Sequence, residues 1–143
     1  PTEDLAFEAS WLVKQVGKDM NVQCMVSTDG TNLREDIMRL IHEAHGVHIL
    51  VATPGRLLGL LRKKVCNLNQ CHMVAMDEAD KLLCPELQPT IEHLLKFLPE
   101  DRQISIYSAT FPMTMLDFKN RLCRRKLDQV AFVFRDEADT KAT

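Results

Sequence analysis

Residues 72–110 read HMVAMDEADKLLCPELQPTIEHLLKFLPEDRQISIYSAT, and this stretch decides the fold. An apolar segment at residues 72–76 runs into the acidic tetrad at 77–80. After a helix-like segment, a second apolar run at 103–107 ends in the small polar residues 108–110. Two strands joined through a helix are typically parallel, and ligands of parallel α/β sheets bind beyond the carboxyl ends of the strands. We therefore expect both polar clusters at one edge of a single sheet.

The remainder of the chain continues this alternation of apolar strands and amphipathic helices. Helices are expected over residues 3–19, 33–44, 53–63, 91–98 and 112–121, and further strands over residues 22–26, 48–52 and 130–134. The alternation predicts a doubly wound parallel α/β sheet. The last, charged stretch, residues 135–143, is expected to be a frayed tail.

The composition is that of a chain that can fill one core but has no general affinity for polyanions. Of its 143 residues 45% are hydrophobic, and the formal net charge is −2. Any contact with nucleic acid must therefore come from a local groove. The five cysteines lack paired CxxC spacing, which favours reduced thiols. No apolar run approaches the length of a membrane span, so we expect no membrane partner.

The acidic residues after the apolar segment at residues 72–76 are suited to bind a divalent cation. Mg²⁺ keeps most of its waters and is held through one or two carboxylates, and Asp77 and Glu78 supply such a pair. The alternative is an acidic helix start favoured by the helix dipole. The same four letters recur at residues 136–139 with neither helix nor strand after them, and we interpret that copy as surface tail.

Two other groups of residues have a chemical and a plain structural interpretation. In Thr53-Pro54-Gly55-Arg56 the threonine can cap a helix and the proline fits its first turn, so free N–H groups and one arginine would face a phosphate. The alternative is an ordinary capped helix. His42, His45 and His48 are spaced by threes, but we interpret them as solvated or core histidines rather than metal ligands.

Together these stretches resemble the motifs of the DEAD-box RNA helicases, which are ATP-driven RNA-remodelling enzymes. Residues 77–80, 108–110 and 53–56 match family motifs, and PTEDLA at residues 1–6 is similar to an altered PTREL motif. The sequences around these motifs (TNLREDIMRL, MDEADKLL, RQISIYSATFP) are most similar to those of the cytoplasmic subgroup that represses translation and promotes mRNA decapping. The resemblance implies a RecA-like sheet of the P-loop NTPase type, with residues 1–134 as part of the ATP-binding lobe.

The resemblance also implies a role for each matching residue. Asp77 would hold the Mg²⁺ of Mg-ATP through water, and Glu78 would polarise the water that attacks the γ-phosphate. Asp80 would couple the ATP state to RNA separation together with Ser108, Ala109 and Thr110. Contacts with the RNA backbone are implied for the other motif residues, Pro1, Thr2, Gly30, Thr53, Pro54, Gly55 and Arg56. ATP and Mg²⁺ would be the cofactors, and RNA, a second RecA-like lobe and mRNA-decay proteins the partners.

The chain departs from the family pattern at two positions on the RNA side. Glu3 stands where the PTREL motif has arginine, and Asp29 stands before Gly30 where the family has paired glycines. These changes shift the local charge by about three units towards repulsion of phosphate. We therefore expect weakened RNA binding.

A larger departure is the missing phosphate loop. No GxxxxGK[ST] sequence occurs, and Gly17-Lys18 lacks both the earlier glycine and the following hydroxyl residue. We expect an incomplete RecA-like fold that lacks the P-loop strand and helix, and no ATP hydrolysis by these residues alone. The family's topology would place the missing strand beside residues 103–107 and would leave an unpaired edge there.

The function that follows is part of an ATP-dependent RNA helicase in mRNA decay or translational repression, expected in the cytoplasm and in processing bodies. The alternative is a non-catalytic, truncated or degenerate relative that acts as a binding or scaffold protein. Glu3 and Asp29 favour the alternative, whereas the intact acidic and Ser-Ala-Thr motifs favour the enzyme.

Overall fold

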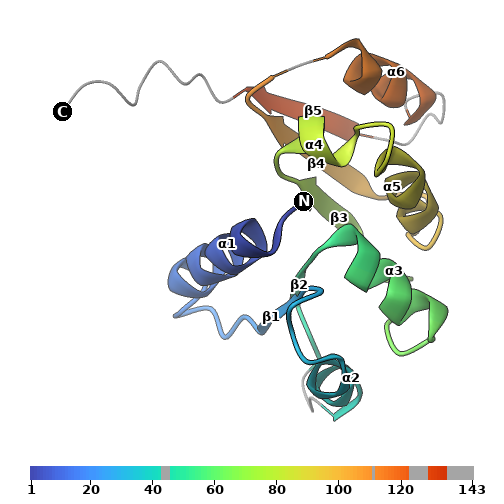
Figure 1. Cartoon of the computed structure of the whole chain (residues 1–143). Coiled ribbons are helices and arrows are strands. Elements are labelled where there is room, and N and C mark those ends of the chain that lie inside the picture. The colour runs from blue at the N-terminus through green and yellow to red at the C-terminus, as the bar shows by residue number, and fades with distance from the viewer. Residues whose placement is uncertain (43–45, 111, 123–128, 135–143) are drawn as a thin grey trace. The chain divides into compact units, whose positions relative to one another are not determined.

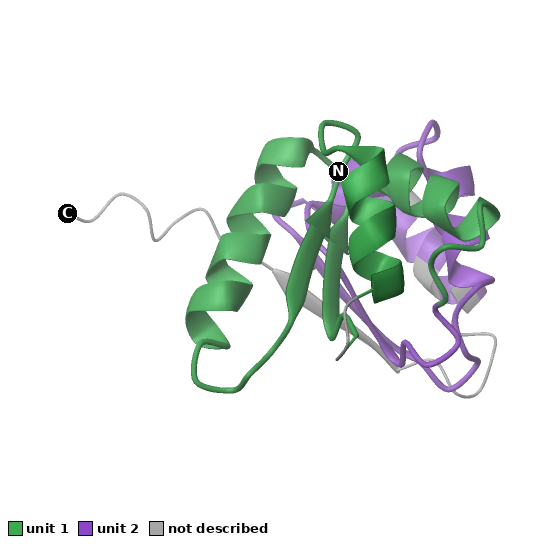
Figure 2. Cartoon of the chain, turned by 90° about the horizontal axis from the view of Figure 1, so that it is seen from below, with its two compact units in different colours: residues 1–67 green, residues 68–143 purple. Residues whose placement is uncertain are grey.

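The computed structural model describes residues 1–42, 46–110, 112–122 and 129–134 (Figure 1). The chain divides into two compact units, residues 1–67 and residues 68–143, which Figure 2 shows in different colours. The second acidic tetrad and the rest of the predicted tail lie outside the described residues, as does His45.

Unit 1 contains a short parallel sheet and the helices that follow its strands. Its elements are α1 (Glu3–Val16), β1 (Cys24–Ser27), α2 (Leu33–His42), β2 (Ile49–Ala52) and α3 (Pro54–Arg62). Strands β1 and β2 pair in parallel from Cys24↔Ile49 to Ser27↔Ala52, and α1 contacts both. The hydroxyl of Thr2 caps α1 by accepting a hydrogen bond from the Leu5 N–H at 3.4 Å.

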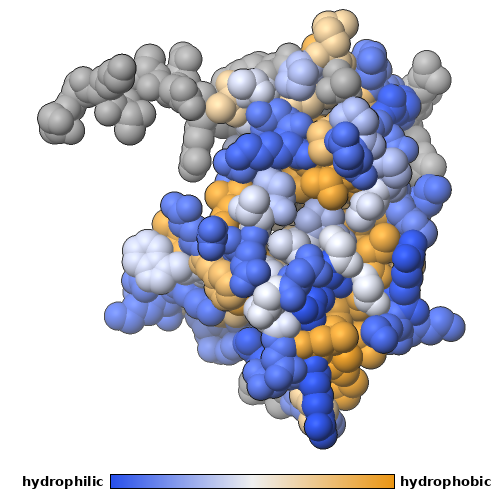
Figure 3. Space-filling view, in the orientation of Figure 1, coloured by the Kyte–Doolittle hydropathy of each residue, from blue (hydrophilic) through white to orange (hydrophobic). Residues whose placement is uncertain are grey.

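The apolar stripe predicted for α1 consists of Leu5, Ala9, Leu12, Val13 and Val16, and none of these side chains is fully covered. Ala6 is buried, whereas Leu12 and Val16 are 55% and 72% exposed, as is Trp11 at 62%. In the space-filling view hydrophobic residues reach the surface in separate places between hydrophilic ones (Figure 3). The helix was therefore predicted correctly, but its two buried residues, Ala6 and Ser10, lie outside the predicted stripe.

Unit 2 contains a three-stranded parallel sheet with the order β3-β4-β5. Its elements are β3 (Met73–Met76), α4 (Ala79–Leu82), α5 (Gln88–Leu95), β4 (Gln103–Ser108), α6 (Met113–Leu122) and β5 (Gln129–Phe134). Its core includes the fully buried side chains of Leu83, Ile104, Ile106, Met115 and Phe118. All described strand pairs in both units are parallel, which confirms the predicted α/β class.

The prediction that the strand at residues 103–107 would have an unpaired edge is wrong. Strand β4 pairs with β3 on one side and with β5 on the other, from Gln103↔Gln129 to Ser108↔Phe134. The N–H and C=O groups of a strand edge gain hydrogen bonds from any parallel strand that can reach them. Here β5 supplies those bonds, so β4 is interior to the described sheet.

Candidate functional site

The carboxyl ends of β3 and β4 bring two distant motifs together in unit 2. We call Asp77, Glu78, Asp80, Ser108 and Thr110 the acidic cluster. The Thr110 hydroxyl donates a hydrogen bond of 2.7 Å to the Asp80 carboxylate, and the Asp80 N–H donates one of 3.3 Å to the Ser108 hydroxyl. The parallel register, with Met76 beside Ile106, makes these contacts possible because both strands end at the same edge. The expectation that both polar clusters share one sheet edge is confirmed.

The contacts with Asp80 favour its charged form. Burial raises the pKa of this carboxyl, but the hydrogen bonds from Thr110 and Ser108, followed by those from backbone N–H groups, lower it by more. The net effect holds the pKa of Asp80 below its usual range. Asp80 is therefore an anionic acceptor that depends on the hydroxyls of the neighbouring strand.

Glu78 has an unusual backbone conformation between β3 and α4. Its φ of 49° and ψ of 50° lie in the left-handed region, which costs a non-glycine residue about 1–2 kcal/mol. Its side chain accepts a hydrogen bond of 2.8 Å from the Lys81 ammonium. Backbone strain of this kind is concentrated at functional sites.

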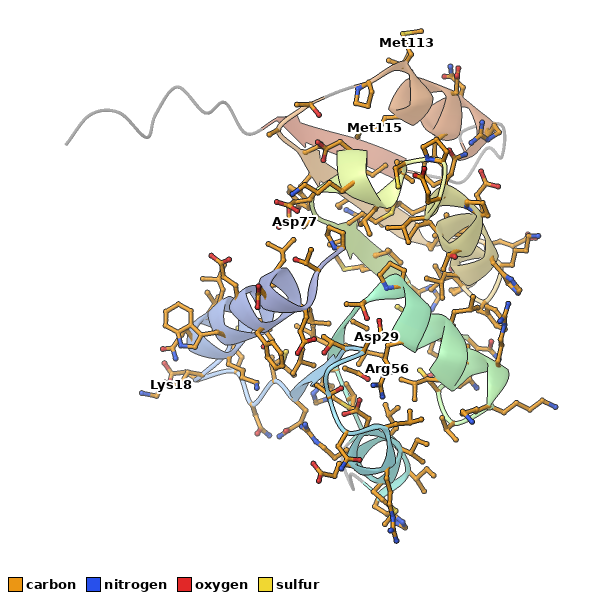
Figure 4. The ribbon with its side chains drawn as sticks, in the orientation of Figure 1. Lys18, Asp29, Arg56, Asp77, Met113 and Met115 are labelled. Atoms are coloured by element: carbon orange, nitrogen blue, oxygen red, sulfur yellow. The ribbon has the colours of Figure 1, made fainter. Side chains whose placement is uncertain are left out.

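Asp77 lies directly at the end of β3, as Figure 4 shows. Its Oδ1 accepts a hydrogen bond of 2.9 Å from the Glu78 N–H, and the residue is half-buried. In the described part of the chain no three His, Cys, Asp or Glu side chains are arranged to hold a metal. A pair of carboxylates nevertheless fits a Mg²⁺ that keeps most of its waters, since such an ion needs few protein ligands.

Unit 1 brings the remaining motif-like stretches together at the start of α3. We call Glu3, Asp29, Gly30, Thr53, Gly55 and Arg56 the α3 cluster. Thr53 precedes α3 with an extended backbone and Pro54 occupies the first turn, as predicted. The Thr53 hydroxyl makes no capping hydrogen bond with the helix, however; it donates one of 3.1 Å to Oδ2 of Asp29. The half-buried Pro1 and the exposed Thr2 precede Glu3 at the start of α1.

Arg56 points into the protein. Its guanidinium donates hydrogen bonds of 2.8 Å and 3.2 Å to the carbonyls of Thr31 and Asp29, and its side chain is 10% exposed. Its Nη1 lies 3.5 Å from Oδ2 of Asp36, whose side chain is 6% exposed. The described contacts of Arg56 are all within unit 1, where they hold the structure together. The contact with RNA that the resemblance implies for Arg56 stays a prediction.

Asp36 was not singled out from the sequence. Besides facing Arg56, its carboxylate lies 2.6 Å from the hydroxyls of both Ser27 and Thr31. The signal was present, because Asp36 lies within the predicted apolar stripe of α2, three residues after Leu33 and four before Leu40. An acid on a buried helix face needs a cationic partner.

Two carboxylates border the exposed side of the α3 cluster. The Asp29 side chain is 75% exposed, and its Oδ2 lies 3.7 Å from the position that a Cβ on Gly55 would take. A Cβ on Gly30 would collide with the carboxylate of Glu3. Both departures from the family pattern are therefore located on the same surface.

Two other residues considered from the sequence, His48 and Lys18, lie outside the two clusters. His48 accepts a hydrogen bond of 3.0 Å at Nδ1 from the Gln23 N–H. Lys18, beside the glycine that ends α1, is exposed and points outward (Figure 4). None of the helices in the described ranges has the length and apolarity needed to cross a membrane.

Comparison with known proteins gives a consistent result. The model of the DEAD/DEAH box helicase family matches residues 1–118. DEAD-box ATP-dependent RNA helicase 12 of Oryza sativa is 54% identical over 125 residues, which are 87% of this chain and 23% of that protein. The probable ATP-dependent RNA helicase ddx6 of Dictyostelium discoideum is 53% identical over 90% of this chain and 30% of its own length. ATP-dependent RNA helicase DHH1 of Yarrowia lipolytica is 52% identical over 85% of this chain and 23% of its length.

The solved structures agree. A hypothetical ATP-dependent RNA helicase from Sulfolobus tokodaii matches with a TM-score of 0.75 and 26% identity, over 92% of this chain and 38% of that one. The fold is therefore RecA-like and incomplete, as predicted. The chain spans between 23% and 30% of the length of these curated relatives. With a family model over residues 1–118 and relatives above half identity, the chain belongs to the DEAD/DEAH box helicase family.

Proposed function

We propose that this chain is part of the first RecA-like lobe of an ATP-dependent RNA helicase. The observation that supports this most directly is the contact of Asp80 with Ser108 and Thr110. This contact joins Asp80, which follows the carboxylates of Asp77 and Glu78, to the end of β4. Asp77 and Glu78 precede Asp80 by three and two residues, so a change at either can reach β4 through this short stretch of backbone and the hydrogen bonds of Asp80.

The acidic cluster would serve the nucleotide. Asp77 would hold a hydrated Mg²⁺ and Glu78 would orient the attacking water, while bound Mg-ATP supplies the phosphoryl group and the neutralising charge. Residues that cradle the phosphates are not among the 143 of this sequence, since it has no GxxxxGK[ST]. The acidic cluster thus fits the metal side of such a site and not its phosphate side.

The α3 cluster would serve the RNA backbone. The start of α3, a nine-residue helix, offers N–H groups to an anion, and Gly55 leaves that end accessible. Pro1, Thr2, Gly30, Thr53 and Pro54 belong to the same proposed surface. Contacts of this kind grip the chain without reading bases.

The cellular role is proposed from the named relatives. Similarity to the ddx6 and DHH1 helicases favours a role in mRNA decay or translational repression in the cytoplasm, including processing bodies. Mg-ATP would be the cofactor, and a second RecA-like lobe and mRNA-decay proteins would be the partners.

A chimera tests the proposal. Residues 1–118 would replace the matching segment of the Yarrowia helicase, to which the chain is 52% identical. We expect the chimera to hydrolyse ATP, and Glu78→Gln to reduce that rate by at least about 100-fold, as expected for loss of a positioned catalytic group. Exposed Glu8→Gln is the control with the same change of chemistry. A folded chimera without ATPase activity, or one that Glu78→Gln leaves active, would contradict the proposal.

A further inference from the structure

The start of α3 has an anion close to it from within the chain. Oδ2 of Asp29 accepts the Thr53 hydroxyl proton and lies next to Gly55, while Oδ1 is 4.0 Å from Nε of Arg56. This carboxylate therefore lies where a phosphate at the helix start would lie, beside a hydroxyl donor, a guanidinium and a glycine without a side chain. The Asp29 carboxylate is itself 75% exposed, so it occupies the outer, accessible side of the cluster.

The turn that carries Asp29 is held in place by other groups. The Thr28 N–H donates to the Thr31 hydroxyl at 3.0 Å, and the Thr31 N–H donates to the Thr28 carbonyl at 3.1 Å. Arg56 donates to the carbonyls of Asp29 and Thr31. None of these hydrogen bonds uses the Asp29 side chain, so the turn presents its carboxylate to Thr53 without depending on it.

In the α3 cluster the negative charges are on the exposed side and the positive charge of the arginine is buried. The guanidinium of Arg56 is directed towards the buried carboxylate of Asp36, at 3.5 Å. The Glu3 carboxylate lies against Gly30, next to Asp29. An incoming phosphate therefore meets two carboxylates before it can approach the one arginine of the cluster.

We propose that the Asp29 carboxylate is an internal ligand of the α3 start and excludes an external phosphate from it. RNA that uses the α3 cluster must first displace or repel this side chain, so Asp29 sets the affinity of the lobe for the RNA backbone. This inference rests on the proposed function, because it concerns the same surface.

The test compares the full chain with Asp29→Asn and Asp29→Gly. Asparagine keeps an oxygen that can accept the Thr53 proton but removes the charge, and glycine removes both. The control is Asp19→Asn, which changes the same charge at an exposed position after α1. Inorganic phosphate is titrated while the amide signals of Gly55 and Arg56 are followed by NMR, and a ten-nucleotide uridine RNA is titrated by fluorescence anisotropy at several salt concentrations.

We expect both Asp29 variants to bind the RNA about tenfold more tightly than the parent and Asp19→Asn, which corresponds to about 1.4 kcal/mol. One added phosphate contact would steepen the slope of log K against log salt by about 0.7. Phosphate should shift the Gly55 and Arg56 signals in the Asp29 variants and not in the parent.

The outcomes separate the two proposals. Phosphate shifts without a gain in RNA affinity would support Asp29 as the internal ligand and would count against RNA contact by the α3 cluster. Equal phosphate shifts in parent and variants, or no shift in any of them, would overturn the inference whatever the RNA affinity.

Discussion

Replacing Arg56 with alanine is expected to destabilise unit 1 by about 3–5 kcal/mol, because it leaves a buried carboxylate without its cation. The side chains of Arg56 and Asp36 are 10% and 6% exposed, so water cannot replace the guanidinium without local opening. Two hydrogen bonds to the carbonyls of Asp29 and Thr31 are lost as well. The loss is a large fraction of the 5–15 kcal/mol that usually stabilises a domain.

The assay is urea unfolding followed by far-UV circular dichroism. Exposed Arg34, at the start of α2, provides the matched control, since Arg34→Ala is expected to change the free energy of unfolding by less than about 0.5 kcal/mol. The double variant Arg56→Ala/Asp36→Asn removes the unpaired charge, and we expect it to be more stable than Arg56→Ala alone. If Arg56→Ala does not fold at all, a folded double variant would still show that the unpaired Asp36 charge is the cause.

Two results would refute the reasoning. If Arg56→Ala unfolds within about 0.5 kcal/mol of Arg34→Ala, the guanidinium is not a buried structural group. If the double variant is no more stable than Arg56→Ala alone, the instability does not come from an unpaired Asp36 charge.

Two further predictions concern the acidic cluster. Glu78→Gly is expected to stabilise the chain by about 1 kcal/mol in the same urea assay, because glycine adopts the left-handed conformation without strain, whereas Glu78→Gln keeps the strain and should stay within about 0.5 kcal/mol. Equal stability of the two variants would count against strain at this position. Thr110→Val removes a hydrogen bond to Asp80 and is expected to cost about 1 kcal/mol at neutral pH. Since the pKa of Asp80 is lowered on folding, its contribution is present above the unfolded-state pKa and is lost as pH falls through the folded value, so parent and variant should converge in acid. A difference that is constant with pH would disprove the role of the charge.

The sequence predicted the acidic cluster well because its geometry follows from topology. Once residues 73–76 and 103–108 are parallel neighbours, Asp80 and Thr110 must be near one another, and no side-chain detail is needed. Helix and strand positions followed from periodicity for the same reason. The helix predicted over residues 91–98 is observed as α5 (Gln88–Leu95), and the short α4 (Ala79–Leu82) was not predicted; Pro85, which cannot donate a backbone hydrogen bond, lies between the two.

The α3 cluster was predicted less completely, because its behaviour depends on which way one side chain points. Arg56 was expected to face a phosphate; the position of Asp36 in the helical pattern called for a cationic partner, but nothing in the sequence identified Arg56 as that partner or Thr31 as its carbonyl acceptor. The pairing of β4 with β5 was missed for a different reason. Strand order depends on which edges compete for partners, and hydrophobic pattern alone does not determine that competition.

The turn that carries Asp29 has an evolutionary consequence. Its shape is maintained by backbone groups, by the Thr31 hydroxyl and by Arg56, and Asp29 itself does not have the positive φ that would demand glycine. The residue at this position can therefore change without disturbing the architecture that surrounds it. Aspartate and glycine codons differ by a single base, so one point mutation can interconvert an acidic and a neutral surface while leaving selection for folding unaffected.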